Sequence, residues 1–218
     1  MSGKFSKSSL KQQIAEEIKK MIFEGKLKQG EKITEQQVSQ SLDVSRTSVR
    51  EAVLLLEQEG LLISEAYKDT KVTTISQEEV LEILIPMRLQ IETFALKKGL
   101  STWGEDTKSQ FETILEGMRK ATVYKDLSMF IELDIQLHGL IVQASGLENV
   151  IRIWESIVNR IRLHFLHQNS RSGTMEKWLQ EHEELVTILV SNSSLEVALE
   201  ALKSHIVDTN LPDVYLLD

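Results

Sequence analysis

Apolar residues in the first third of the chain recur every three or four positions, which is the spacing of one helix face. Each of three such lines begins shortly after a serine or threonine, residues that can accept hydrogen bonds from the free N–H groups of a first helical turn. The segment Asp43-Val44-Ser45 separates the second line from the third. The sequence therefore predicts three helices, the last two joined by a tight turn. The lines are Ile14, Ile18, Met21 and Ile22; Val38 and Leu42; and Val49, Ala52, Val53 and Leu56.

Two β-prone runs follow, Leu61 to Ile63 and Lys71 to Ile75. They predict a two-stranded wing with Lys68 and Lys71 near its tip. Two short helices joined by three or four residues and followed by a wing make a winged helix-turn-helix. We therefore expect a DNA-binding domain over residues 1–75.

The start of the third predicted helix carries side chains suited to nucleic acid. Ser45 can cap the helix, and Arg46, Thr47, Ser48 and Arg50 lie off its apolar line. In a helix-turn-helix this end enters the major groove, where arginine can pair with guanine and hydroxyl groups can hold phosphates. The pattern predicts contact with double-stranded DNA.

From Ser76 onward the pattern is helical almost to the end. Ser76-Gln77-Glu78-Glu79 has the form of a capping box, and five later breaks divide the remainder. The expected fold is mainly α, with the winged domain followed by an all-α six-helix bundle over residues 76–218. The breaks fall near residues 99–106, 122–126, 145–149, 169–174 and 191–194.

Composition places the acidity of the chain in its second half. The 218 residues carry a net charge of −8, yet residues 1–72 hold 12 Lys and Arg against 11 Asp and Glu. A near-neutral domain with cations at one helix end can bind DNA through a local patch. The chain has no apolar run of 18 residues and no signal-peptide pattern, so we expect a cytoplasmic protein without membrane contact.

Polar residues interrupt three apolar lines of the predicted bundle. Asp134 and His138 lie four residues apart on one inward face, and His182 and His205 interrupt the lines of the last two helices. Four such ligands aimed at one interior predict a divalent metal, with zinc first and nickel, manganese or iron also suitable. The alternative is that they are core histidines bonded to carbonyl groups or to Asp134.

Two arginines are candidates for binding an effector. A six-coordinate metal with these four ligands would leave two positions open for a small organic acid. Arg88 lies on the inward side of the first bundle helix and could pair with the acid, and Arg160 is a second candidate. The alternative for Arg88 is an ion pair with a glutamate of the bundle.

The first 75 residues resemble a known regulator domain. The stretch TEQQVSQSLDVSRTSVREAVLLLEQEGLL, preceded by GKLKQGEKI, resembles the winged helix-turn-helix of the GntR superfamily of bacterial transcription regulators. The resemblance implies that Arg46 and Arg50 are the main DNA-contacting arginines, that Thr47 and Ser48 lie on phosphates, and that Gln36 and the wing add contacts. The chain departs from the family pattern at Thr47-Ser48, usually Thr-Pro, and at Asp69 in the wing.

Residues 78–207 resemble the FCD domain of the FadR subfamily, in its shorter, VanR-like six-helix form. The matching segments are FIELDIQLHGLI, EHEEL and LKSHI, together with MRLQIETFALKKG and IVQASGLENVIRI. The resemblance implies that Asp134, His138, His182 and His205 bind the metal.

Three hypotheses remain open from the sequence. The first is a homodimeric transcription regulator, commonly a repressor, whose operator affinity responds to an acid bound at the metal. The second is a metal-dependent hydrolase with a DNA-targeting domain, for which Glu183 is the only adjacent general-base candidate. The third is a metal that only stabilises the bundle.

Overall fold

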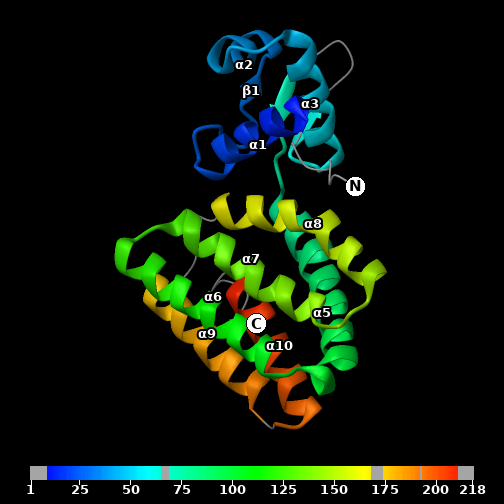
Figure 1. The fold of residues 1–218 in the computed structure, drawn as a ribbon, viewed down its shortest axis with the longest axis vertical. Helices are drawn as coiled ribbons and strands as arrows, with labels where there is room; N and C mark the ends of the chain where they lie inside the picture. Colours follow the sequence, from blue (N-terminus) through cyan, green and yellow to red (C-terminus); the bar gives the residue numbers. More distant parts are fainter. Residues whose placement is uncertain (1–8, 65–68, 168–173, 192, 211–218) are drawn as a thin grey trace, which may run out of the picture. The chain divides into compact units, whose positions relative to one another are not determined.

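The protein divides into two compact units, Met1–Ile75 and Ser76–Asp218. The computed structural model describes residues 9–64, 69–167, 174–191 and 193–210, and Figure 1 shows its helices and strands. The predicted wing residue Lys68 lies outside the described residues. Within the described residues, no helix is both long enough and apolar enough to cross a bilayer.

Three helices form most of the first unit: α1 (Leu10–Phe23), α2 (Glu35–Leu42) and α3 (Arg46–Gln58). Thr34 and Ser45 cap α2 and α3, since their side chains accept hydrogen bonds from the N–H groups of Gln37 and Ser48. Both α1 and α2 pack on α3, whose residues Val49, Ala52, Val53 and Leu56 are all buried. The three predicted helices are therefore present, with the predicted face inward.

The turn between α2 and α3 depends on one left-handed residue. Asp43 ends α2 at φ 52°, a conformation that aspartate tolerates better than most residues. The Ser39 hydroxyl donates to the Val44 carbonyl at 2.6 Å, which fixes the next peptide. This turn directs the start of α3 away from α2.

The wing has three strands where the sequence predicted two. These are β1 (Lys32–Ile33), β2 (Leu62–Ser64) and β3 (Thr70–Val72), antiparallel in the order β1-β3-β2. The prediction missed β1 because two residues in a polar segment give no alternation to detect. Lys71 lies in the middle of the central strand β3, exposed, opposite Lys32 and Ile63.

The second unit is entirely helical in its described residues, as predicted. A continuous first helix comprises α4 (Gln77–Glu79), a π-helical turn η1 (Val80–Leu84) and α5 (Ile85–Gly99), and a short 3₁₀ turn η2 (Leu100–Thr102) follows. Five more long helices make six among the described residues: α6 (Glu105–Tyr124), α7 (Leu127–Gln143), α8 (Glu148–His167), α9 (Met175–Val190) and α10 (Leu195–Asn210).

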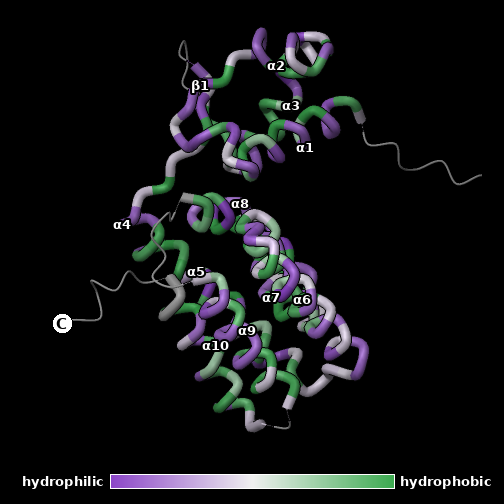
Figure 2. Tube along the Cα trace, turned by 90° about the vertical axis from the view of Figure 1, so that its left-hand side faces the viewer, coloured by the Kyte–Doolittle hydropathy of each residue, from purple (hydrophilic) through white to green (hydrophobic). Residues whose placement is uncertain are grey.

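The core of this unit lies around α5 and α7. Helix α7 packs against α5, α6 and α8, while α10 packs against α5 and α9. Figure 2 shows hydrophobic and hydrophilic positions alternating along these helices. Apolar side chains from α5, α7 and α8, among them Ile91, Ile135, Trp154 and Phe165, form one buried cluster.

Two local features define the first helix. Pro86 lies two residues after the end of the π turn. It has no N–H to donate, and its ring would clash with the carbonyl four residues earlier in an α-helix, which accounts for the wider turn. At the other end, a Cβ atom on Gly99 would lie 2.7 Å from the Ala144 carbonyl oxygen. The end of α5 therefore lies so close to the end of α7 that a side chain larger than that of glycine does not fit at position 99.

Candidate metal centre and nucleic-acid interface

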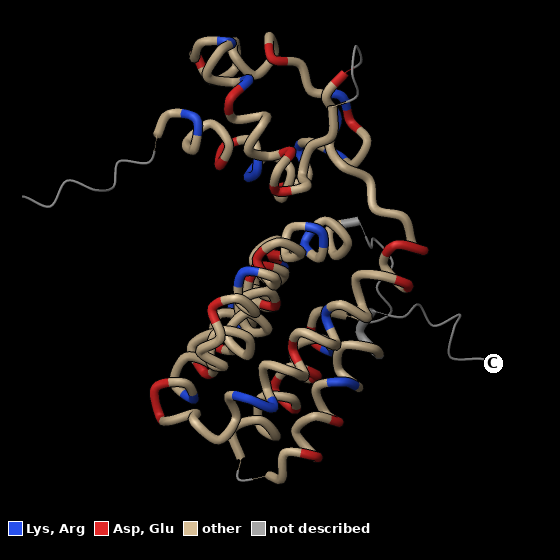
Figure 3. Tube along the Cα trace, turned by 90° about the vertical axis from the view of Figure 1, so that its right-hand side faces the viewer, with Lys and Arg blue, Asp and Glu red and all other residues tan. Residues whose placement is uncertain are grey.

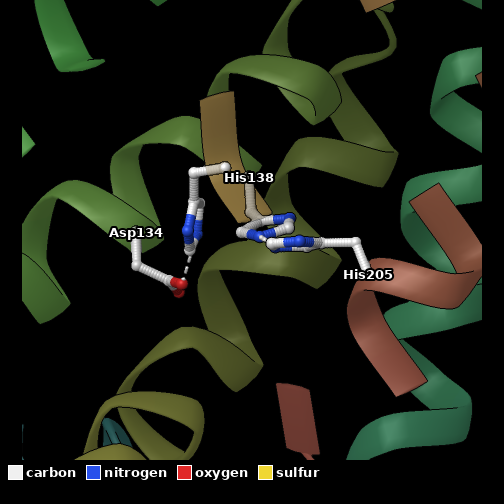
Figure 4. A group of neighbouring side chains, drawn as sticks. Asp134, His138 and His205 are labelled. Atoms are coloured by element: carbon white, nitrogen blue, oxygen red, sulfur yellow. Dashed lines mark hydrogen bonds and ion pairs between the residues drawn. The ribbon is translucent and has the colours of Figure 1, made fainter. Parts of the chain in front are cut away.

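Four side chains that the sequence singled out meet inside the second unit. Asp134 and His138 come from α7, His182 from α9 and His205 from α10. One ligand atom from each lies within 4.8 Å of those of the others. All four residues are buried, and Figure 4 shows Asp134, His138 and His205 converging. Since α7 places residues four apart on one face, the spacing from Asp134 to His138 brings both side chains inward.

His182 lies between two hydrogen-bond acceptors. Its Nδ1 is 2.7 Å from the Trp178 carbonyl oxygen, and its Nε2 is 2.8 Å from Asp134 Oδ1. A neutral imidazole carries only one N–H, so it can satisfy only one of these contacts. Both contacts can be satisfied only if a second proton or a cation is present between His182 and Asp134.

His138 is held by a residue that the sequence reading missed. Its Nδ1 lies 2.6 Å from Glu92 Oε2, and its Nε2 lies 3.3 Å from His205 Nε2. Glu92 is fully buried on α5 and accepts a hydrogen bond of 2.7 Å from Arg88 Nε. The detectable signal was the spacing from Arg88 to Glu92, four residues apart on an otherwise apolar face.

Burial and neighbouring charges shift the pKa values of three cluster residues. Burial alone would raise the pKa of the Asp134 carboxyl, but the hydrogen bond to His182 and nearby positive charges hold it well below its usual value. Burial, with the charge of Arg88, lowers the pKa of His138, although Glu92 and Asp134 oppose that shift. Burial and the other imidazoles lower the pKa of His205 well below its usual value. These shifts favour the ionised carboxyl and the neutral imidazoles, which are the forms that bind metals.

The donor set fits a divalent cation. Asp134 Oδ2 is buried and has no hydrogen-bond partner among the described atoms, so this oxygen could bind a cation. Three imidazoles and one carboxylate are the ligand types that zinc and related metals prefer. The Asp134, His138, His182 and His205 set could therefore hold one ion.

The two predicted effector residues lie in different environments. Arg88 is buried, and its Nη1 has no partner among the described atoms. The cavity that Arg88 lines with Ile161 and His164 measures about 10 Å³, which is room for one water molecule at most. Arg160 is half-buried on α8, where its Nη1 donates to the Ser156 carbonyl at 3.3 Å.

A pocket on α9 and α10 reaches the cluster from outside. It measures about 230 Å³, and its lining includes Glu181, Glu184, Ser204 and His205. Two carboxylates at the opening favour the approach of a cation over that of an anion.

The described residues among those predicted to contact DNA lie on α2, at the start of α3 and on β3. Arg46 and Thr47 are exposed, as is Gln36 on α2. The hydroxyls of Ser45 and Ser48 lie 2.9 Å apart, and Ser45 also accepts from the Ser48 N–H, so both take part in the helix cap. Figure 3 shows acidic and basic positions interspersed along the described parts of the chain.

Arg50 and the wing carry ion pairs that the sequence did not reveal. Arg50 binds Glu35 through two hydrogen bonds of 2.8 and 3.0 Å, although 70% of its side chain is exposed. The hydrogen bond and charge of Arg50 lower the pKa of Glu35. Asp69 pairs with Lys32 at 2.6 Å, so the acidic wing residue is partly neutralised.

Comparison with known proteins identifies both units. Residues 10–72 match the gntR family of bacterial regulatory proteins, and residues 82–208, more than half of the chain, match the FCD domain family. The chain belongs to the gntR-family regulators that carry an FCD domain. Members of this family are transcription regulators rather than enzymes, and they bind DNA operators.

Similar proteins share most of the length of this gntR-family regulator. The HTH-type transcriptional regulator YdhC of Bacillus subtilis is 28% identical over 89% of this chain and 85% of its own. The gluconate operon transcriptional repressor of Bacillus licheniformis is 24% identical over 93% and 84%. A GntR regulator from Rhodococcus sp. RHA1 has the same fold, with a TM-score of 0.80, 21% identity and coverage of 93% and 96%.

The hydrolase hypothesis loses its general base. Glu183 accepts a hydrogen bond of 2.7 Å from Arg119 Nε, with 39% of its side chain exposed. Glu183 is therefore part of an ion pair with Arg119 at the surface. Together with membership of a regulator family, this removes the reason to expect hydrolysis.

Proposed function

We propose that this protein is a homodimeric transcription repressor whose affinity for its operator depends on a divalent metal and a small carboxylate effector in the FCD domain. The observation that carries the proposal is the buried meeting of Asp134, His138, His182 and His205, whose ligand atoms lie within 4.8 Å of one another. Zinc is the first candidate for the ion, with nickel, manganese and iron next.

The DNA-binding part rests on the first unit. We propose that Arg46 reads a base in the major groove while Thr47, Ser48, Arg50, Gln36 and Lys71 hold phosphates, with Ser45 positioning the helix start. A single short helix contacts few base pairs, so two copies on a near-palindromic operator would double the site. The relatives named as gluconate and D-xylose operon repressors support repression as the outcome.

Charge balance supports an anionic effector. Asp134, Glu92 and Arg88 are buried together and carry a formal charge of −1. A bound divalent ion would supply two positive charges, which leaves +1 in a low-dielectric interior. A monoanion such as a carboxylate would cancel it. Two relatives are named for the operon of gluconate, which is itself a carboxylate.

Effector binding would change the bundle. Arg88 Nη1 would be the donor to the acid, with Arg160 as a weaker candidate, yet the cavity beside Arg88 holds only about 10 Å³. An organic acid would therefore bind only a more open bundle arrangement. That difference in affinity between two arrangements is what an effector needs in order to shift an equilibrium.

The test combines composition with binding. Elemental analysis and native mass spectrometry of the purified protein should give one metal ion per subunit and a dimer. Operator duplexes, selected from a random library, should then bind with an affinity that changes when metal is removed or gluconate is added. The comparison uses His182→Ala, which should lose the metal, and His164→Ala, an imidazole outside the ligand set, which should keep it.

Two results would contradict the proposal. Equal metal content in wild type and His182→Ala would show that the ligands are wrong. Operator affinity unchanged by both metal removal and a panel of small carboxylates would remove the regulatory role.

A further inference from the structure

The structure assigns Glu92 a positioning role: it orients His138 so that Nε2 faces the cluster, and Arg88 in turn orients Glu92. This inference rests on the proposed metal site and names residues outside the ligand set. It starts from a buried chain of contacts, Arg88 Nε to Glu92 Oε1 at 2.7 Å and Glu92 Oε2 to His138 Nδ1 at 2.6 Å. Glu92 is not a member of the four-residue ligand cluster.

Donor and acceptor roles in this chain are forced. The Arg88 guanidinium can only donate, and an ionised carboxylate can only accept, so Glu92 receives a hydrogen bond from each side. His138 must then carry its proton on Nδ1. Its Nε2 is then an acceptor, which lies 3.3 Å from Nε2 of His205 inside the cluster.

His182 is also oriented by a hydrogen-bond partner, but its partner is a backbone carbonyl group. His182 Nδ1 lies 2.7 Å from the Trp178 carbonyl oxygen, which turns its Nε2 toward Asp134. A carbonyl and a carboxylate are the two outer partners that usually orient metal-binding histidines. The Glu92 side chain on α5 therefore orients His138, as the Trp178 carbonyl group on α9 orients His182.

The substitution Glu92→Gln separates orientation from packing. The amide oxygen must face Arg88 Nε, because that group only donates, so the amide NH₂ faces His138 Nδ1. His138 must then accept at Nδ1 and carry its proton on Nε2. The shape of the side chain is almost unchanged, yet the nitrogen that should face the ion is blocked.

The experiment measures zinc binding and the His138 tautomer in the full-length protein. Zinc affinity is determined by competition with a chromophoric chelator, and the tautomer by ¹⁵N NMR of metal-free protein. We expect Glu92→Gln to lower zinc affinity about 10–100-fold and to move the His138 proton from Nδ1 to Nε2. The matched control is Glu132→Gln, another carboxylate paired with an arginine, at 3.0 Å from Arg162 Nη2. It should change neither quantity.

Each outcome decides the inference. Wild-type zinc affinity in Glu92→Gln, or a wild-type His138 protonated on Nε2, would overturn it. The second measurement needs no variant, so it holds even if Glu92→Gln does not fold. A wild type that binds no zinc would refute the proposed function, while the NMR result would still decide how Glu92 orients His138.

Discussion

At the scale of single residues, each buried aspartate, glutamate and arginine among the described residues contacts a polar partner. Asp134 contacts His182, Glu92 contacts both His138 and Arg88, and Arg88 also lies 5.6 Å from the centre of the Phe165 ring. Removing one member would leave an uncompensated buried charge, which costs more than a lost surface pair. The arginines of α3, in contrast, are exposed, although Arg50 is paired with Glu35.

Exposed arginines on α3 lead to the first prediction. Arg46→Ala should reduce discrimination between the selected operator and random DNA by about 1–3 kcal/mol, because it removes contacts to a base. Arg50→Ala should weaken both duplexes alike and reduce the salt slope by about one, because it removes a phosphate contact. Fluorescence anisotropy over a range of salt concentrations measures both quantities. Identical behaviour of the two variants would refute this division of roles.

The sequence singled out the four residues that cluster but not the glutamate that contacts one of them. Asp134, His138, His182 and His205 stood out because each interrupts an apolar line. Glu92 did so as well, but it could be read as the structural partner of Arg88, and only the fold brings it to 2.6 Å from a histidine 46 residues away. Likewise, the pairing of Arg50 with Glu35 depends on the angle between α2 and α3, which no periodicity encodes.

At the scale of elements, the first helix of the second unit combines a strong start with an irregular middle. The Ser76 hydroxyl accepts from the Glu79 N–H at 3.1 Å, while Glu79 accepts from the Ser76 N–H at 2.9 Å. The capping box was predictable because it is local. The π turn at Val80–Leu84 was not, since apolar spacing alone does not distinguish it from an α-helical turn.

The cap gives a prediction that depends on pH. Ser76→Ala should lower the free energy of unfolding by about 0.5–2 kcal/mol. Hydrogen bonds from Ser76 lower the pKa of Glu79 from its usual value of 4.5. The ionised carboxylate therefore stabilises the folded state above pH 4.5, and this contribution is lost as the pH falls through the lowered pKa. Urea unfolding should therefore separate wild type from Glu79→Gln at pH 7 and bring them together at acid pH. A constant difference would show that the charge is irrelevant.

The contact between α5 and α7 gives a second prediction at this scale. Gly99→Ala would place Cβ 2.7 Å from a backbone oxygen, and such overpacking costs about 1–3 kcal/mol. The control is Gly139→Ala on α7, where Cβ would meet only Trp154 Nε1 at 3.4 Å. Because alanine favours a helix by about 1 kcal/mol over glycine, the control should be neutral or more stable. Thermal melting compares them, and equal losses would contradict the close approach.

At the scale of the whole molecule, the mainly helical fold with its winged first unit was predictable from periodicity and caps. The third strand of the wing, the ion pairs and the contact of Glu92 with His138 were not predictable, because they depend on how the elements pack. We propose that the first unit binds DNA and the second binds metal. Operator affinity should therefore depend on whether metal is bound.

Metal removal separates a regulatory ion from a structural one. An ion present at 100 times its dissociation constant stabilises the folded state by about 2.7 kcal/mol, so chelation should lower the melting temperature. A regulatory ion should also change operator affinity in the same samples. A lower melting temperature with unchanged operator affinity would identify the metal as purely structural.

The glycine contact at the end of α5 also limits how that helix can move. With no side chain between Gly99 and the backbone at Ala144–Ser145, this end of α5 has no space in which to slide. The opposite end of the helix adjoins the wider π turn, Val80–Leu84. Any tilting of the helix would therefore pivot about Gly99, so that Val80–Leu84 would travel farther than the Glu92 region and a small change near the ligands would be magnified at the helix start.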